Sequence, residues 1–166
     1  MIKLEGIQTI LKDELEQLRQ RIIANMERVG AVASGRTRDS MHVETSNDGG
    51  ILYGGLPDGA PFGTLETGRR AGKTPYNFAS IILQWMSDKG ISATPKGRQT
   101  QEAADKSLSW AIATSIGRKG TRLFQSGGRT DVYSNEIPRT IENVQSRVID
   151  QLSLIVESIN INANNI

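Results

Sequence analysis

The chain has 166 residues, of which 37% are hydrophobic and 23% are charged, and it contains 17 glycines and no cysteine. This composition is that of an ordinary globular protein, and it excludes a disordered tail protein and a collagen-like fibre. The lack of cysteine excludes disulfide scaffolds, thiolate metal sites and cysteine nucleophiles. Because a chain of this length buries roughly 70% of its unfolded surface, we expect one domain over residues 1–160, followed by a flexible tail over residues 161–166.

The N-terminal segment lacks the features of an exported or membrane protein. Lys3 and Glu5 interrupt the segment where a signal peptide has its apolar region. No apolar run reaches the length of about 18 residues that a membrane-spanning helix needs. We therefore expect a soluble protein that is made in a cytosol and does not contact a membrane.

The net charge of +2 is unevenly distributed along the chain. Residues 60–130 hold 11 Lys or Arg against 4 Asp or Glu, whereas residues 1–59 and 131–166 both carry net negative charge. A basic middle between acidic ends favours contact with an anionic partner, or head-to-tail contact between identical subunits. Scattered, solvated charge is the alternative interpretation.

The first thirty residues predict one amphipathic helix over about residues 5–29. Apolar residues recur there at three- and four-residue steps, and Gly30 is a suitable C-terminal stop. Charged residues between them, including Glu14, are expected on a solvated face. The apolar stripe consists of Ile7, Ile10, Leu11, Leu15, Leu18, Ile22, Met26 and Val29.

A β-hairpin is expected next, after a polar connection over residues 34–40. Residues 41–45 alternate apolar and polar, as a half-buried strand does, and residues 51–54 predict the returning strand. The Asn-Asp-Gly-Gly sequence at residues 47–50 predicts a turn with a connection longer than two residues.

The rest of the chain predicts three further helices separated by long loops. Helical spacing of apolar residues is present over residues 77–89 and 102–118, and again from Ile141 to Ile159, with Pro138 as the first residue of that second long helix. Asn77 is the expected cap of the helix over residues 77–89.

The fold class that follows is α+β, with the long N-terminal helix and the further helices packed on a small antiparallel sheet. Long extended loops are expected over residues 54–76, 90–101 and 117–131. Trp85 and Trp110 fall on the apolar stripes of their helices and are expected to pack in the core.

No residue pattern predicts an active site. His42 is the only histidine, and it lies close to Ser40 and Asp39. On a strand Asp39 points to the face opposite the other two, so a catalytic triad is not expected, and His42 is predicted to face solvent.

Metal or cofactor binding is not expected either. Glu66 is an isolated carboxylate in its loop, whereas Glu102 and Asp105 lie one helical turn apart beside Lys106 and predict a surface pair. A metal site needs several converging ligands.

The sequence Gly117-Arg118-Lys119-Gly120-Thr121 superficially resembles the end of a phosphate-binding P-loop. A P-loop requires a preceding strand and a helix that starts at its Lys-Thr pair. Here the stretch ends a predicted helix, where Arg118 and Lys119 complement the helix dipole. We therefore do not expect a P-loop.

The candidate interaction site consists of basic residues in the two glycine-rich loops. We expect them to pair with carboxylates of other subunits or virion proteins, or to contact an anion such as nucleic acid. The residues are Arg69, Arg70, Lys73, Arg118, Lys119, Arg122 and Arg129.

Residues 54–76 and 117–131 hold few apolar side chains with which to anchor themselves. We therefore expect contacts with other subunits or virion proteins to order them. Glu136, Glu142 and Asp150 of the C-terminal helix are the candidate partners.

Three short motifs also follow one another in a characteristic order. Ser34-Gly35-Arg36-Thr37-Arg38-Asp39-Ser40 leads into a strand, Phe62-Gly63-Thr64-Leu65-Glu66-Thr67-Gly68 forms a loop, and a helix ends in Ile116-Gly117-Arg118-Lys119-Gly120-Thr121. Over about residues 5–135 this order resembles the small head–tail joining proteins of tailed bacteriophages, the neck or tail-completion family.

The resemblance implies an α+β subunit of a homo-oligomeric ring between the portal complex and the tail. It implies the virion neck or tail region as the location after assembly in the host cytoplasm, and no catalysis or cofactor. The implied partners are the subunit itself, portal or adaptor proteins, tail proteins and DNA passing through the channel. Two other classes stay open: a basic nucleic-acid-binding module, and a phage-associated nuclease, against which the lack of a carboxylate cluster argues.

Overall fold

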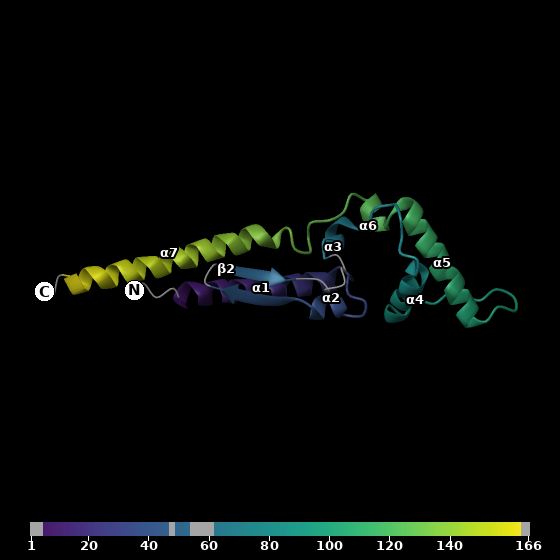
Figure 1. Cartoon of the computed structure of the whole chain (residues 1–166), viewed down its shortest axis with the longest axis horizontal. Helices are drawn as coiled ribbons and strands as arrows, with labels where there is room; N and C mark the ends of the chain where they lie inside the picture. The colour runs from purple at the N-terminus through teal and green to yellow at the C-terminus, as the bar shows by residue number, and fades with distance from the viewer. Residues whose placement is uncertain (1–4, 47–48, 54–61, 164–166) are drawn as a thin grey trace.

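The computed structural model describes residues 5–46, 49–53 and 62–163 and has an elongated α+β fold, as the sequence predicts (Figure 1). Helix α7 extends toward one end of the molecule, and helices α4 and α5 form the other end (Figure 1). The elements in chain order are α1 (Glu5–Arg28), α2 (Arg36–Asp39), β1 (His42–Ser46), β2 (Gly49–Tyr53), α3 (Thr64–Thr67), α4 (Phe78–Asp88), α5 (Gln101–Lys119), α6 (Arg122–Gln125) and α7 (Glu136–Ala163).

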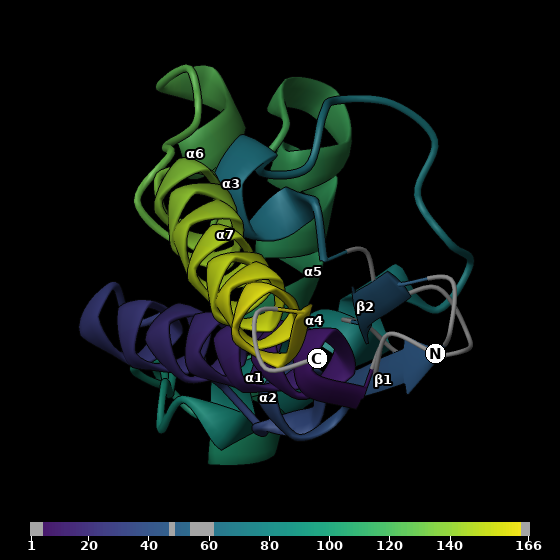
Figure 2. The same ribbon diagram turned by 90° about the vertical axis from the view of Figure 1, so that its left-hand side faces the viewer.

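Helix α1 is the central element, because both the hairpin and α7 pack against it (Figure 2). The predicted apolar stripe is confirmed, since Ile10, Leu18, Ile22 and Met26 are buried. Burial of such a stripe is what stabilises a long amphipathic helix. The cluster that forms around it comprises Leu18, Ile22, Met26, Met41 and Val132, with Phe62, Leu65 and Tyr133 packed at its edge.

The polar face of α1 is not fully solvated, which corrects the expectation for Glu14. Its side chain is buried, and its carboxylate accepts hydrogen bonds from Arg147 Nη1 at 2.9 Å and Asn143 Nδ2 at 3.2 Å. Both donors lie on α7. The periodicity of α1 alone contains no information about a second helix on its other side.

The two strands form an antiparallel hairpin whose register runs from His42↔Tyr53 to Ser46↔Gly49. Because Gly49 and Gly50 belong to β2, only residues 47–48 connect the strands, and the expectation of a longer connection is wrong. Residues 47–48 and 54–61 themselves lie outside the described residues. A Cβ on Gly50 would lie 2.6 Å from Leu15 Cδ1, so a glycine there lets β2 lie directly against α1. His42 is exposed, as predicted.

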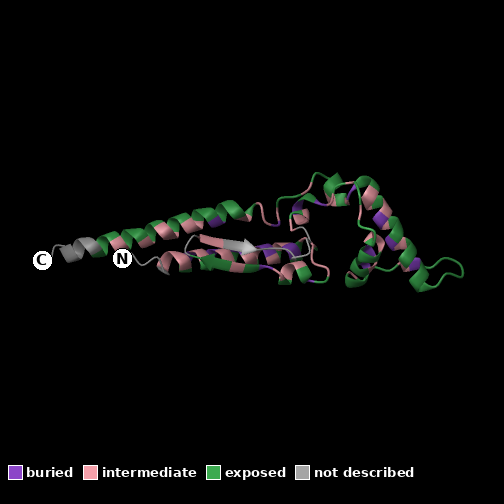
Figure 3. Ribbon diagram, in the orientation of Figure 1, coloured by how far each residue is buried: buried purple, intermediate pink, exposed green. Residues whose placement is uncertain are grey.

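A second, smaller core lies between α4 and α5 and consists of Ile82, Met86 and Ala113 with partly buried neighbours (Figure 3). Trp85 and Trp110, expected in the core, are 39% and 67% exposed. The reason is that α4 and α5 pack mainly against each other, so the side chains on the outer faces of the pair stay in contact with solvent.

Polar contacts fix the α4–α5 pair in place. Lys89 at the end of α4 donates from Nζ to the carbonyls of Gly30 and Val32 at 2.6 and 2.5 Å. Asp105 is not part of a surface pair, because it accepts hydrogen bonds from Ala93 N at 2.6 Å and Gln101 Nε2 at 3.1 Å.

The remaining helix boundaries refine the expectations. Glu102 lies at the surface as expected, where it pairs with Lys106 at 2.6 Å. Asn77 precedes α4 as expected, but its side chain makes no capping hydrogen bond. Helix α7 begins at Glu136, which places Pro138 within the first turn, where a missing N–H costs nothing. It continues to Ala163, so residues 161–163 of the expected tail are helical, and residues 164–166 lie outside the described residues.

Replacing Ile22 by Asp is expected to lower the free energy of unfolding by on the order of 3–5 kcal/mol, because the charge would enter the core beside Met26 and Val132. Leu15→Asp, at a half-buried position, is expected to cost less. Urea denaturation followed by circular dichroism measures both. Ala24→Asp, exposed on the same helix, is the control, and an equal loss in Ile22→Asp and Ala24→Asp would contradict the assignment.

Candidate functional site

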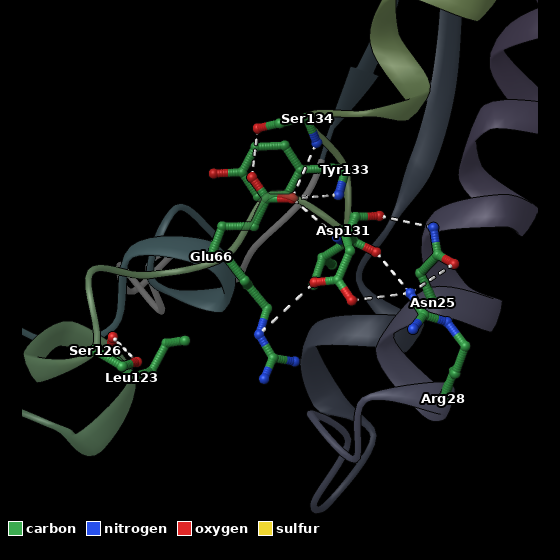
Figure 4. Close-up of polar contacts among 10 residues, drawn as sticks. Asn25, Arg28, Glu66, Leu123, Ser126, Asp131, Tyr133 and Ser134 are labelled. Carbon is green, nitrogen blue, oxygen red and sulfur yellow. Dashed lines mark hydrogen bonds and ion pairs between the residues drawn. The ribbon is translucent and has the colours of Figure 1, made fainter.

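Glu66 on α3 has no second carboxylate among its hydrogen-bond partners, and its carboxylate accepts hydrogen bonds from backbone amides and a hydroxyl of residues 132–134. It is 3% exposed. Its Oε1 accepts hydrogen bonds from the backbone amides of Val132, Tyr133 and Ser134 at 2.9, 2.7 and 3.0 Å, and its Oε2 accepts one from the Ser134 hydroxyl (Figure 4). The carboxylate therefore joins α3 to the segment that leads into α7.

The ionisation of Glu66 follows from these contacts. Burial raises the pKa of the Glu66 carboxyl, but the hydrogen bonds from Ser134, Tyr133 and Val132 outweigh it and hold the pKa below its ordinary value. Burial and the negative charge of Glu66 together raise the pKa of Tyr133. Glu66 is thus ionised, and both of its carboxylate oxygens accept hydrogen bonds from the chain itself. This arrangement is typical of a carboxylate with a structural role.

The same segment is held from its other side by α1. Asn25 Nδ2 donates to the Val132 carbonyl at 3.2 Å, and Arg28 Nη2 donates to the Asp131 carbonyl and to Asp131 Oδ2 at 3.0 and 3.1 Å (Figure 4). Residues 131–134 therefore connect α1 and α3, and their position sets where α7 begins.

The two glycine-rich loops are hydrogen-bonded to each other within the chain. The Thr121 amide donates to the Arg69 carbonyl at 2.8 Å, Thr121 Oγ1 accepts from the Arg69 amide at 2.9 Å, and the Gly72 amide donates to the Gly117 carbonyl at 2.9 Å. We call this pairing of residues 69–72 with residues 117–121 the loop contact. In addition, the Arg129 amide donates to the Glu66 carbonyl at 2.9 Å.

Two glycines make this close approach feasible. A Cβ on Gly68 would lie 2.5 Å from both Phe124 N and Thr121 Oγ1, and a Cβ on Gly120 would lie 2.7 Å from the Arg69 carbonyl oxygen. Both glycines also have positive φ, a conformation that other residues rarely adopt. The described parts of these loops are therefore hydrogen-bonded to each other within the subunit, and their further ordering by other subunits or virion proteins stays a prediction.

The structure divides the seven predicted basic residues into two groups. Arg69 donates from Nη2 to the Lys73 carbonyl at 2.8 Å and places its guanidinium 5.0 Å from the centre of the Phe78 ring, and Arg129 lies 3.8 Å from Asp131. The side chains of these two have partners within the chain. The other five are exposed, gather around the loop contact, and have no ion pair with any described carboxylate; this basic cluster consists of Arg70, Lys73, Arg118, Lys119 and Arg122.

The acidic residues expected as partners also fall into two groups. Glu136 pairs with Arg21 within the subunit at 3.0 Å, so it is already neutralised. Glu142 and Asp150 are exposed on α7.

Neither a metal centre nor a membrane span is found in the described part of the chain. No group of three or more His, Asp or Glu side chains there could hold a metal ion. None of the described helices is both long and apolar enough to cross a membrane.

Comparisons with protein-family models, curated proteins and solved structures gave no match.

Glu66→Ala is expected to lower the free energy of unfolding by several kcal/mol, because one buried and two partly buried amides would lose their acceptor, at about 1–3 kcal/mol for each amide that stays buried without one. Glu66→Gln keeps an acceptor for the amides and is expected to lose less. The exposed Glu142→Gln is the control.

The ionisation of Glu66 also makes stability depend on pH. Since the pKa of Glu66 is lower in the folded protein than its ordinary value of 4.5, the contribution of Glu66 to the free energy of unfolding is complete above that value and is lost as the pH falls through the folded pKa. Urea titrations from pH 7 to pH 3 should show this loss for the wild type and not for Glu66→Gln.

The loop contact makes a separate prediction about the isolated subunit. The amides of Gly72, Thr121 and Arg129 are expected to exchange slowly with solvent deuterium, because each donates to a carbonyl of the other loop. Thr121→Val, which removes the side-chain acceptor of the Arg69 amide, is expected to speed exchange at Arg69. Exchange at all of these amides as fast as in an unfolded peptide would show that the loops need a partner.

Proposed function

We propose that this protein is a structural subunit of a tailed-bacteriophage virion, a ring-forming neck or tail-completion subunit that joins the portal complex to the tail. The observation that carries the proposal is the large apolar surface that α7 leaves exposed. The three sequence motifs resemble those of the head–tail joining proteins, and this resemblance indicates which kind of assembly is expected. Catalysis has no place in this role.

The exposed surface of α7 is extensive. Six large apolar side chains of this helix are between 41% and 62% exposed (Figure 3). The contacts of α7 with α1 include polar pairs, such as Arg147–Glu14 at 2.9 Å and Arg21–Glu136 at 3.0 Å. The exposed side chains are Ile137, Ile141, Ile149, Leu152, Leu154 and Val156.

The spacing of these side chains favours one continuous contact. Ile141, Ile149, Leu152 and Val156 fall on the same side of α7, because steps of eight, three and four residues return to one helical face. Exposed apolar patches of this kind mark protein–protein interfaces. A partner that covers α7 is therefore expected.

A second exposed apolar surface lies on α4. Ile81 is 45% exposed and Trp85 is 39% exposed, and both line a hollow shared with Ala33, Ser34 and Arg36. Two different apolar surfaces on one subunit permit heterologous contacts, and such contacts between identical copies close into rings when the rotation allows it. This supports a ring more than a two-fold dimer.

The residues that carry the family resemblance form contacts within the subunit. Glu66 and Gly68 of one motif and Gly120 and Thr121 of another form the carboxylate site and the loop contact. Residues 34–40 contain the short helix α2 that turns the chain into β1. The motifs thus maintain the shape of the subunit, which supports a role in assembly.

The purified wild-type protein is expected to form ring-shaped homo-oligomers, seen by light scattering after size exclusion and by negative-stain electron microscopy. Ile149→Asp with Leu152→Asp is expected to abolish assembly and leave the melting temperature of the subunit nearly unchanged, because both side chains are exposed. Ser146→Asp with Ser153→Asp adds the same charge at exposed positions outside the apolar row and is the control. A wild type that stays monomeric at high concentration, or rings formed by the first variant, would contradict the proposal.

A further inference from the structure

The basic cluster carries positive charge that the fold does not neutralise. The four acidic residues between residues 62 and 130 all have other partners within the chain. Glu66 accepts four hydrogen bonds, Asp88 accepts one from Gln84, Glu102 pairs with Lys106, and Asp105 accepts the Ala93 amide. Holding five cations together without counter-charge opposes folding through self-repulsion. A bound anion removes that repulsion.

The loop contact brings these cations together on a fixed backbone. Arg70 and Lys73 flank the Gly72–Gly117 hydrogen bond from one loop, and Arg118, Lys119 and Arg122 flank the Thr121–Arg69 hydrogen bonds from the other. About fifty residues separate the two groups in sequence. Because the backbone is already ordered, a ligand does not have to bear the entropic cost of ordering both loops.

The number and type of the cations favour a phosphate polymer. Five unit charges exceed what one phosphate group neutralises, and three of them are guanidinium groups, which bind phosphate oxygens through paired hydrogen bonds. Gly72, between Arg70 and Lys73, is exposed and has no atom within 4 Å of its Cβ position, so it leaves room for a backbone to approach.

The surroundings of the cluster favour nucleic acid over an acidic protein. Protein–protein interfaces are depleted of charge at their centre and use buried aromatic anchors. Nucleic-acid interfaces are more polar and far more positively charged. Around the cluster, the Phe78 ring is covered by Arg69, the Phe124 ring lies against Gly120 and is 40% exposed, and Tyr76 is fully exposed.

The same aromatic inventory favours a duplex over a single strand. Single-stranded binding sites rely on several exposed rings on which successive bases stack. One fully exposed tyrosine and one partly exposed phenylalanine do not form such a series of rings, and five cations beside them are instead suited to the outside of a double helix. We propose that the basic cluster binds the phosphate backbone of double-stranded DNA without reading its base sequence. This inference rests on the charges and contacts of the loops, not on the ring assembly.

The experiment is the binding of a fluorescent 30-base-pair DNA duplex to the full-length protein, followed by anisotropy between 50 and 200 mM salt. We expect affinity in the range of about 10⁻⁴–10⁻⁶ M at physiological salt, falling steeply as salt rises. The triple variant Arg70→Gln, Arg118→Gln, Arg122→Gln is expected to bind at least ~10-fold more weakly, with a salt slope smaller by about 0.9 for each phosphate that the variant no longer neutralises.

The matched control neutralises three exposed cations outside the cluster: Lys12→Gln, Arg98→Gln and Arg139→Gln. It has the same net charge as the test variant and is expected to keep wild-type affinity within about twofold. Replacing the three arginines of the cluster by lysine keeps the charge and should retain most of the binding. This variant therefore distinguishes loss of charge from a general effect of changing these positions.

Four results would overturn the proposal. They are no binding at 50 mM salt, equal losses in the test and control triples, tighter binding of the single strand than of the duplex, and equal competition by polyglutamate of matched charge. The measurement is repeated in the Ile149→Asp, Leu152→Asp background, so that loss of assembly and loss of DNA binding are told apart.

Discussion

The arrangement of this fold depends on one buried carboxylate. Glu66 accepts three backbone amides and one hydroxyl from residues 132–134, which lie more than sixty residues further along the chain. That segment enters α7 directly, so the carboxylate sets the start of the longest helix relative to α3 and α1. A buried anion of this kind is stable because every hydrogen bond to it is charge-assisted.

The loop contact extends this constraint to the basic part of the chain. Once Glu66 and the Arg129 amide place residues 129–134, the turn after α5 lies against the turn after α3, and the glycines at 68 and 120 allow the two backbones to approach. The two turns then form one ordered surface with five exposed cations. Basic residues from two loops that are far apart in the sequence thus lie on one surface, where their charges add to a strong positive potential.

The apolar residues are distributed differently. The chain builds two small cores, one on α1 and one between α4 and α5, and leaves much of the apolar surface of α7 and α4 uncovered. Elongated shape and divided cores expose more surface than a single compact core does. Apolar surface left in this way is unfavourable in water, and an assembly that covers it removes the penalty. The basic cluster and the apolar row of α7 lie on different elements, so each can meet its own partner.

Local patterns in the sequence determined the α+β class, the long helix α1 with its buried stripe, the hairpin and the positions of α4, α5 and α7, because each depends on periodicity or turn residues within one segment. Tertiary structure alone decided the roles of Glu14, Glu66, Trp85 and Trp110, since burial depends on which distant element covers a face. It also separated Arg69 and Arg129, whose side chains have partners within the chain, from the five cations of the basic cluster. A sequence reports the charge of a side chain, but whether that charge is neutralised depends on contacts between residues that are far apart along the chain.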